Sequence, residues 1–196
     1  MTDITSGIGR PRDRILGTAR SLFRRCGIRG TGVDAIAETA GTNKMTLYRH
    51  FQSKDALIVA CLQQATIDAD VFWQKLEEMA PGDPAGQLDA WVACVEENLH
   101  DNRGCDVSNA AVELPEACDT VRQTISDFKK DQRLRLIQLC RDAGAVEAEE
   151  LADTLALLVE GARISKQTMG ETGPSGSFGR CAKVAVASFL RHGAAA

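Results

Sequence analysis

The sequence has no run of about 18 uninterrupted apolar residues, which is the length that a membrane-spanning helix requires. The N-terminal stretch MTDITSGIGRPR also lacks the apolar centre of a secretory signal peptide. Both absences predict a cytoplasmic protein without a membrane partner.

Cysteine spacing gives no sign of a disulfide framework, because the seven cysteines form no Cys-x-x-Cys pair and their number is odd. Most of them are therefore expected to be small buried hydrophobic residues. Cys61, Cys94 and Cys140 fit this interpretation best, since each falls within an apolar helical stripe.

Catalytic motifs are missing as well, because the chain has no Gly-x-Ser-x-Gly elbow, no nucleotide-binding loop and no zinc-protease motif. An enzyme would have to use Cys105 as a nucleophile with His100 and a nearby Asp, and no motif supports that set. We predict that the protein is not an enzyme and that it holds neither a cofactor nor a metal ion.

Charge is divided unevenly along the 196 residues, whose formal net charge is −4. Residues 1–60 hold ten Lys and Arg against five Asp and Glu, whereas the remainder holds thirteen against twenty-two. A basic N-terminal part is typical of a segment that faces nucleic acid, and an acidic remainder helps to orient it toward the phosphates.

Helical periodicity dominates the sequence, and no segment alternates apolar and polar residues as a half-buried strand would. We predict an all-α fold with about nine helices. Pro11 and Gly27 bound the first helix, and Ser53 caps a long fourth helix that runs to Pro81. The fifth helix is expected to start at Asp83-Pro84, the sixth to cover about 107–114 and the seventh about 116–143, before two final helices joined by the loop GETGPSGS.

Two short helical patterns flank a glycine turn in the segment VDAIAETAGTNKMTLYRHFQSK. Thr31 is expected to cap the first of these helices together with Asp34, and Gly41 to end it. Asn43 offers a side-chain oxygen to the free amides of a second helix over about residues 44–51. This arrangement predicts a helix-turn-helix.

The second of these helices points only Leu47 and Phe51 inward and otherwise carries many hydrogen-bond donors. So little apolar surface is unfavourable for a freestanding two-turn helix, but it suits a helix laid in the major groove of DNA. The side chains expected to face outward are Lys44, Thr46, Tyr48, Arg49 and His50.

The segment from Ile15 to Leu62 resembles the N-terminal DNA-binding domain of tetracycline-repressor (TetR) family regulators. The resemblance rests on an apolar first helix ending in Phe-x-x-x-Gly, a Thr before Val-x-x-Ile-Ala, a Gly turn, and Leu-Tyr-x-His-Phe followed by Ser-Lys. Gly32 and Thr42 depart from the family pattern, which often has Ser or Thr at the first position and Val at the second. The resemblance implies a DNA-binding domain with a basic arm over residues 1–54 and a helical regulatory domain over residues 55–196.

Roles for the DNA-facing residues follow from their positions and from the resemblance. Lys44 would reach a phosphate or guanine and Thr46 a base edge, while Tyr48 and His50 resemble family positions that bind phosphate oxygens. The alternative is that the charged residues are merely solvated and that Tyr48 packs. The complete set of expected DNA contacts is Thr31, Lys44, Met45, Thr46, Tyr48, Arg49, His50 and Lys54.

The last two helices are expected to form a dimer interface, because the resembled family pairs two such helices from each subunit in a four-helix arrangement. A twofold dimer would also place two recognition helices on one near-palindromic operator. The alternative is that the same stripes close the core of a single chain. The expected interface residues are Leu151, Leu155, Leu158, Ala162, Val184, Ala187 and Leu190.

The regulatory part is expected to bind a small apolar effector in a cavity lined by aromatic side chains and a few polar groups. Packing in the core is the competing interpretation, since stripes at helical spacing are first of all packing surfaces. The candidate effector-binding residues are Phe72, Trp73, Trp91, Cys105, Asn109, Phe128, Gln132 and Met169.

Taken in this way, the sequence predicts a homodimeric transcriptional regulator, a repressor that a small molecule releases from its operator. A redox- or metal-responsive regulator on the same scaffold is the alternative, and it would use His100, Cys105 and Cys118 near one helix junction.

Overall fold

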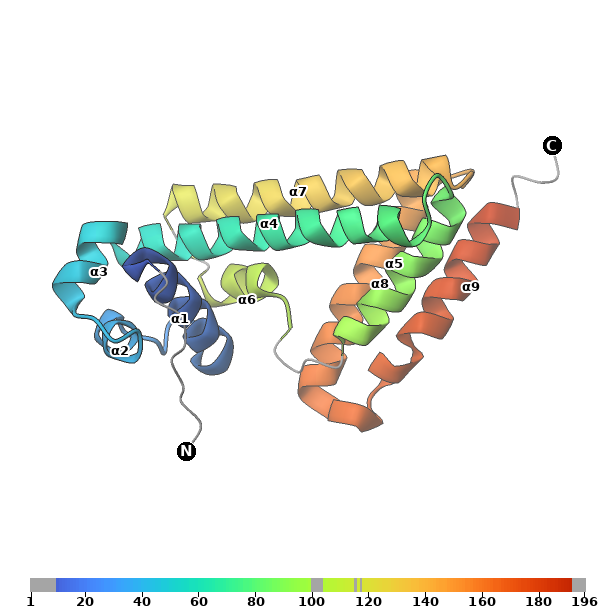
Figure 1. Cartoon of the computed structure of the whole chain (residues 1–196). Coiled ribbons are helices and arrows are strands. Elements are labelled where there is room, and N and C mark those ends of the chain that lie inside the picture. Colours follow the sequence, from blue (N-terminus) through green and yellow to red (C-terminus); the bar gives the residue numbers. More distant parts are fainter. Residues whose placement is uncertain (1–9, 100–103, 115, 117, 192–196) are drawn as a thin grey trace, which may run out of the picture. The chain divides into compact units, whose positions relative to one another are not determined.

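A computed structural model describes residues 10–99, 104–114, 116 and 118–191 of the chain. These residues form nine α-helices and two short 3-10 helices and contain no strand, which confirms the all-α prediction (Figure 1). The helices are α1 (Pro11–Cys26), α2 (Val33–Thr39), α3 (Lys44–Phe51), α4 (Lys54–Met79), α5 (Pro84–Asn98), α6 (Asp106–Glu113), α7 (Asp119–Asp142), α8 (Ala148–Met169), η1 (Gly170–Thr172), η2 (Pro174–Ser177) and α9 (Phe178–Arg191).

Side-chain caps begin three of the helices at the positions predicted from the sequence. The Asn43 side chain accepts a hydrogen bond from the Thr46 amide at 2.8 Å, which starts α3. Ser53 accepts from the Ala56 amide at 3.0 Å at the start of α4, and Asp83 starts α5 in the same way. Each cap satisfies an amide that the first turn of a helix leaves without a backbone partner.

Two boundaries differ from the predicted ones. The seventh helix begins at Asp119, three residues later than 116, and places the Asp119 carboxylate in its first turn, where the helix dipole favours negative charge. The segment between the last two helices was predicted as a loop, but it forms η1 and η2.

Contacts divide the chain into two compact units. The first consists of residues up to 65 together with 106–125, and the second of 66–105 together with 126–196. Helices α4 and α7 each contribute residues to both units. Helix α6 therefore belongs to the same compact unit as the N-terminal helices.

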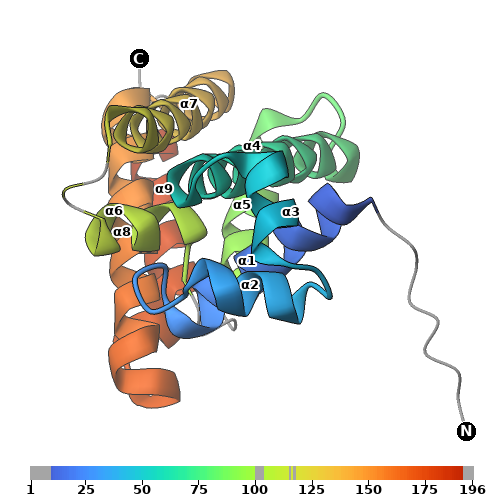
Figure 2. The ribbon, with the colours of Figure 1, turned by 90° about the vertical axis from the view of Figure 1, so that its left-hand side faces the viewer.

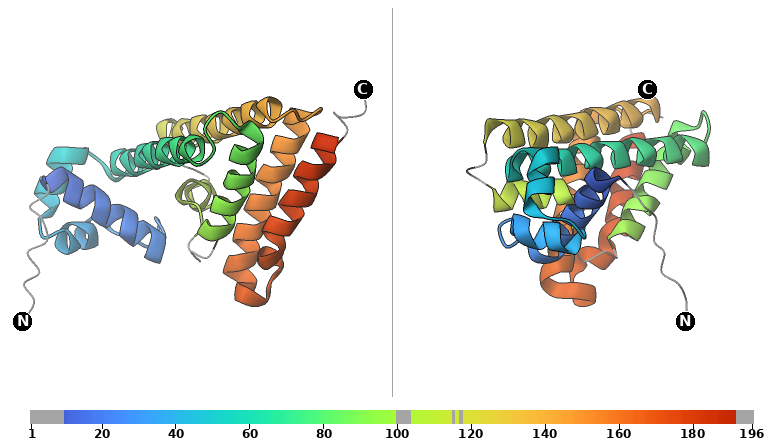
Figure 3. Two further views of the ribbon diagram at one scale, coloured as in Figure 1. Left: turned by 45° about the vertical axis from the view of Figure 1, so that its right-hand side comes forward. Right: turned by 60° about the vertical axis from the view of Figure 1, so that its left-hand side comes forward.

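The core of the second unit lies among α5, α7, α8 and α9. Leu88 of α5, Cys140 of α7 and Leu155 of α8 have no exposed surface, and Ala182 of α9 is equally buried. Helix α9 packs against both α5 and α8, and these three helices run side by side in Figure 3.

Helix α4 alone among the described helices has the length and apolar composition that a membrane crossing requires. Its Leu57 and Leu62 are buried within the first unit, and its Leu76 is buried within the second. Burial of these side chains in protein cores accounts for part of that composition.

The cysteines are all free thiols. Cys61, Cys94 and Cys140 are buried as predicted, and burial raises the pKa of both Cys61 and Cys140 to about 12. The expectation that most cysteines are buried is wrong, because a free Cys on the outer face of a helix has no core to enter. The exposed ones are Cys26, Cys118 and Cys181, and Cys105 is half-buried.

Candidate nucleic-acid interface

Three short helices, α1, α2 and α3, pack against one another at the N-terminal end of the first unit (Figure 2). Ile15 of α1, Ile36 of α2 and Leu47 of α3 have no exposed surface, and Phe51 is almost as deeply buried. A compact apolar centre of this kind fixes α3 although the helix is only two turns long.

A glycine turn sets the direction of α3 relative to α2. Gly41 has a φ of 61°, a left-handed conformation that side chains other than glycine adopt at a cost. The Gly41 amide donates to the Glu38 carbonyl at 3.0 Å, and the Thr42 amide donates to the Ala37 carbonyl at 2.9 Å. Both bonds satisfy carbonyls at the end of α2, as in other helix C-termini closed by glycine.

The outer face of α3 is rich in donors, as the sequence predicted. Lys44, Tyr48 and Arg49 are exposed, and Met45 has 83% of its surface exposed. Thr46 and His50 are half-buried. Six of the eight predicted DNA contacts therefore lie on one two-turn helix, whose buried side is closed by Leu47 and Phe51.

Lys44 has an acidic partner on the neighbouring helix. Its ammonium group donates to the Asp34 carboxylate of α2 at 3.0 Å, and both side chains are exposed. The hydrogen bond and the charge of Asp34 raise the pKa of Lys44 above its usual value. Asp34 was expected to help cap α2, and its side chain instead holds the first residue of α3.

Thr31 does not cap α2, which corrects the sequence prediction. The cap position is Gly32, whose backbone is extended and which has no side chain to accept a hydrogen bond. The Thr31 hydroxyl instead donates to the Gly27 carbonyl at 2.6 Å, and only 3% of the Thr31 surface is exposed. The buried Thr31 side chain therefore stabilises the turn after α1 and is not part of the exposed surface beside α3.

Lys54, the first residue of α4, is tied to the same turn. Its ammonium donates to the Ile28 carbonyl at 2.7 Å, and partial burial lowers the pKa of Lys54. An ammonium group has two further protons, so this bond leaves donors for the phosphate contact predicted from the sequence.

Glu113, at the end of α6, binds the backbone of Ile28 at its amide. Its carboxylate accepts from the Ile28 amide at 2.6 Å and from the Arg29 amide at 3.1 Å. Gly27 has a φ of 76°, and a Cβ added there would lie 2.8 Å from a Glu113 carboxylate oxygen. The close approach of this carboxylate therefore depends on glycine at position 27.

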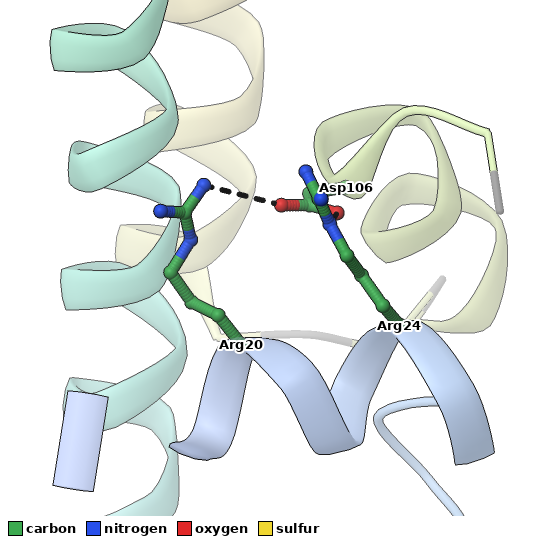
Figure 4. Close-up of polar contacts among 3 residues, drawn as sticks. All are labelled: Arg20, Arg24 and Asp106. Carbon is green, nitrogen blue, oxygen red and sulfur yellow. Dashed lines mark hydrogen bonds and ion pairs between the residues drawn. The ribbon is translucent and has the colours of Figure 1, made fainter. Parts of the chain in front are cut away.

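Asp106 anchors the opposite end of α6 to α1. Its two carboxylate oxygens face the guanidinium groups of Arg24, at 2.5 Å, and Arg20, at 3.5 Å (Figure 4). Arg20 and Arg24 are one helical turn apart, so they share a face of α1. Together, Asp106 and Glu113 make α6 part of the N-terminal unit, and we name this pair the acidic clasp.

The acidic clasp could not be predicted from the sequence, because its bonds join residues more than 80 positions apart. An acidic residue at each end of a short helix is the only local signal, and such residues are common. The space that remains between α1, α4 and α6 is about 20 Å³, room for no more than about one water molecule.

The predicted effector residues are only partly brought together. The Trp73 indole N–H of α4 donates to the Gln132 side-chain oxygen of α7 at 2.8 Å, and Phe72 packs edge-on against Trp73. Trp91 is buried in the core of the second unit, and Met169 is exposed at the end of α8. The half-buried members are Cys105 and Phe128 in the second unit and Asn109 in the first.

The alternative sensor set gains no support from the described residues. Cys105 and Cys118 fall in different units, and His100 lies outside the described residues. Within the described part of the chain, no three His, Cys, Asp or Glu side chains are placed to hold a metal ion.

Burial corrects part of the predicted dimer interface. Leu151, Leu155 and Ala162 lie in the core of a single chain, so they have no surface to offer a partner. The competing interpretation, packing within one chain, holds for these three. Leu158, Ala187 and Leu190 are half-buried, and Val184 is exposed.

An apolar stripe does remain on the outside of α8, one that the sequence analysis missed. Leu157 has 74% of its surface exposed, Ile164 is also exposed, and Gly161 lies between them with open space at its Cα. Leu157 is two residues from Leu155 and so lies on nearly the opposite side of the helix. Leu157, Gly161 and Ile164 are called the outer stripe below.

Comparisons with known proteins find similarity to bacterial transcriptional regulators. The chain matches the family described as bacterial regulatory proteins, tetR family, over residues 15–61. It is 28% identical over 149 residues to the HTH-type transcriptional repressor DhaR of Mycobacterium sp. (strain GP1), covering 74% of each chain. It is 34% identical over 113 residues to the HTH-type transcriptional repressor KstR2 of Rhodococcus jostii, covering 57% of this chain and 52% of that protein.

A solved structure extends the likeness over nearly the whole chain. The TetR-family transcriptional regulator SCO4454 from Streptomyces coelicolor superposes with a TM-score of 0.80 at 27% identity. The superposition covers 93% of this chain and 95% of that one.

Proposed function

We propose that the chain is a bacterial helix-turn-helix transcriptional regulator of the tetR family, and that it represses transcription by binding a near-palindromic operator as a homodimer in the cytoplasm. One observation carries the proposal. The outer face of α3 exposes Lys44, Tyr48 and Arg49 although the inner face is fully buried, so the helix is fixed and its donors are available to DNA. Two relatives with similar sequences, DhaR and KstR2, are themselves repressors by name.

The outer stripe and Val184 support the homodimer. Leu157, Ile164 and Val184 are large apolar side chains left exposed on α8 and α9, and Gly161 allows a second helix to approach closely. Burying these side chains against a second copy removes apolar surface from water and stabilises association. Two α3 helices would then contact one operator, which raises the effective concentration of the second for its half-site.

We place the effector beside the bond between Trp73 and Gln132, where an aromatic pair lies next to polar groups. Gln132 also donates to Asp131, and Asp131 and Asp70 both bind Arg135, so this polar network joins α4 to α7. Helix α4 carries Trp73 within the second unit and Lys54, which holds the Ile28 carbonyl, within the first. A ligand that changes the α4–α7 bonds would therefore act on a helix that also belongs to the DNA-binding unit.

The test begins by selecting an operator from a pool of genomic fragments and measuring its affinity by mobility shift. Lys44→Ala and Arg49→Ala are each expected to weaken operator binding about 10- to 150-fold, since charge-assisted contacts contribute roughly 1.5–3 kcal/mol each. Lys183→Ala is the matched control, because it removes an equivalent exposed positive charge from α9.

Tyr48→Phe separates phosphate contact from base recognition. The variant is expected to weaken binding to the operator and to altered operators by nearly the same factor, because a phosphate contact carries no base information. The proposal fails if Lys183→Ala weakens binding as much as Lys44→Ala, or if no fragment is preferred over any other.

A further inference from the structure

Asp34 is an acidic residue on the face that would meet the phosphates. It lies on α2 with 75% of its side chain exposed, and its carboxylate accepts a hydrogen bond from the Lys44 ammonium at 3.0 Å. Lys44 is the first residue of α3 and is itself 52% exposed. The pair therefore sits in solvent at the entrance to the recognition helix, and packing does not require it.

A carboxylate and a phosphate oxygen compete for the same ammonium protons. When Lys44 meets an arbitrary stretch of DNA, it exchanges one oxygen anion for another, and the exchange contributes little net free energy. Asp34 also repels nearby phosphates, because both are negatively charged. Lys44 therefore adds little to sequence-independent binding, which depends on the number of phosphates that the protein neutralises.

A base acceptor in the correct position changes this balance. The Lys44 ammonium has three donors, so it can keep the bond to Asp34 and donate a second one to an acceptor in the major groove. Asp34 also fixes the direction in which the remaining donors point. An acceptor that lies elsewhere would require the ion pair to break.

We propose that Asp34 is a specificity-determining residue, which suppresses the contribution of Lys44 to sequence-independent DNA binding and preserves its contribution at the operator. The inference rests on the proposed DNA-binding function and adds a role for an acidic side chain at that site. It predicts a protein that discriminates between DNA sequences better with Asp34 than without it.

The experiment compares Asp34→Asn with Glu38→Gln, which removes the same charge from an exposed side chain one turn further along α2. Affinities for the selected operator and for a 30-base-pair duplex of random sequence are measured over a range of salt concentrations, after circular dichroism has shown intact helices. Asp34→Asn is expected to bind the random duplex more tightly than Glu38→Gln does by about two- to fivefold for each subunit of the dimer, an increase equivalent to one exposed ion pair per subunit. Its dependence of log affinity on log salt should be steeper by about 1.8, which corresponds to one more neutralised phosphate in each of the two subunits.

Operator affinity is expected to rise less, so that the ratio of operator to random affinity falls. In a Lys44→Ala background, Asp34→Asn should behave like Glu38→Gln, because the lysine that Asp34 restrains is gone. Equal effects of Asp34→Asn and Glu38→Gln in the natural background would overturn the inference, and so would weaker binding of Asp34→Asn to both duplexes. Failure of the DNA-binding proposal looks different, since the unaltered protein would then bind both duplexes alike or neither of them.

Discussion

Removing the Glu113 carboxylate should loosen the turn after α1, because this group accepts hydrogen bonds from two consecutive backbone amides. The Arg29 side of the turn is exposed, so water can replace the lost acceptor there. Ile28 is buried, and its amide makes the shorter of the two hydrogen bonds to Glu113, at 2.6 Å. The expected loss in Glu113→Ala is therefore dominated by the Ile28 amide and amounts to about 1.5–3 kcal/mol, the usual size for a hydrogen bond to a charged group.

Amide hydrogen exchange followed by NMR measures this loss where it occurs. Each 1.4 kcal/mol of lost protection corresponds to about a tenfold faster exchange, so the Ile28 amide should exchange roughly 10- to 100-fold faster in Glu113→Ala. Glu113→Gln keeps a neutral acceptor at the same position and should show a smaller increase. Glu116→Ala removes a negative charge from an exposed position in the same unit and should leave the Ile28 amide unchanged.

Two results would refute the reasoning. An Ile28 amide that exchanges at the same rate in Glu113→Ala and in the unaltered protein would show that the carboxylate does not protect it in solution. An equal acceleration by Glu116→Ala would show that overall charge, and no specific bond, controls the turn.

Four further predictions concern the second unit and the buried thiol of Cys61. Leu155→Ala should lower the free energy of unfolding by about 2–5 kcal/mol, the usual cost of a large-to-small core change. Leu157→Glu should instead leave each chain folded and convert dimers to monomers in sedimentation. A folded, dimeric Leu157→Glu protein would exclude the outer stripe as the interface. Cys61 should resist alkylation at pH 8 while the exposed cysteines react, and rapid alkylation of Cys61 in the folded protein would contradict this. The pKa of Cys61 in the folded protein, about 12, exceeds the unfolded value near 9. The contribution of the neutral thiol to stability should therefore be lost as the pH rises from about 9 toward 12. Gln132→Leu should lower the free energy of unfolding, measured with urea, by about 1–3 kcal/mol, because the Trp73 indole N–H loses its acceptor. Adding Trp73→Phe should recover part of that loss. No recovery in the double variant would mean that the bond contributes nothing to stability.

Local signals explain why the helix boundaries of the N-terminal unit were predictable. Asn43 and Ser53 cap their helices by bonding an amide three residues along the chain, so the sequence contains both partners. Gly41 ends α2 through its own backbone conformation. Helical spacing is also a local signal, and it predicted that Leu47 and Phe51 point inward and that the remaining side chains of α3 point outward.

Contacts between distant residues account for what the sequence could not predict. Asp106 and Glu113 bind partners more than 80 residues away, and neither the spacing nor the residue types of α6 identify those partners. Thr31 shows the same limit at short range. Its hydroxyl could accept a hydrogen bond from an amide of α2 or donate one to a nearby carbonyl, and it donates to the Gly27 carbonyl.

Periodicity predicts that a helix has an apolar face but does not say what covers it. Helix α8 is apolar on two sides, with Leu155 inside the chain and Leu157 outside. The inner side was predicted to contact a partner subunit, since both sides satisfy the same spacing. Only the positions of α5 and α9, which cover one side of α8, distinguish them.

The backbone of Ile28 is held by residues from two distant parts of the chain, Lys54 at its carbonyl and Glu113 at its amide. A hybrid regulator built by joining residues 1–54 to a foreign regulatory part would keep the first bond and lose the second. It would also separate Arg20 and Arg24 from Asp106. The portable DNA-reading module of this protein is thus discontinuous in sequence, and a successful graft would have to carry residues 106–113 along with the N-terminal helices.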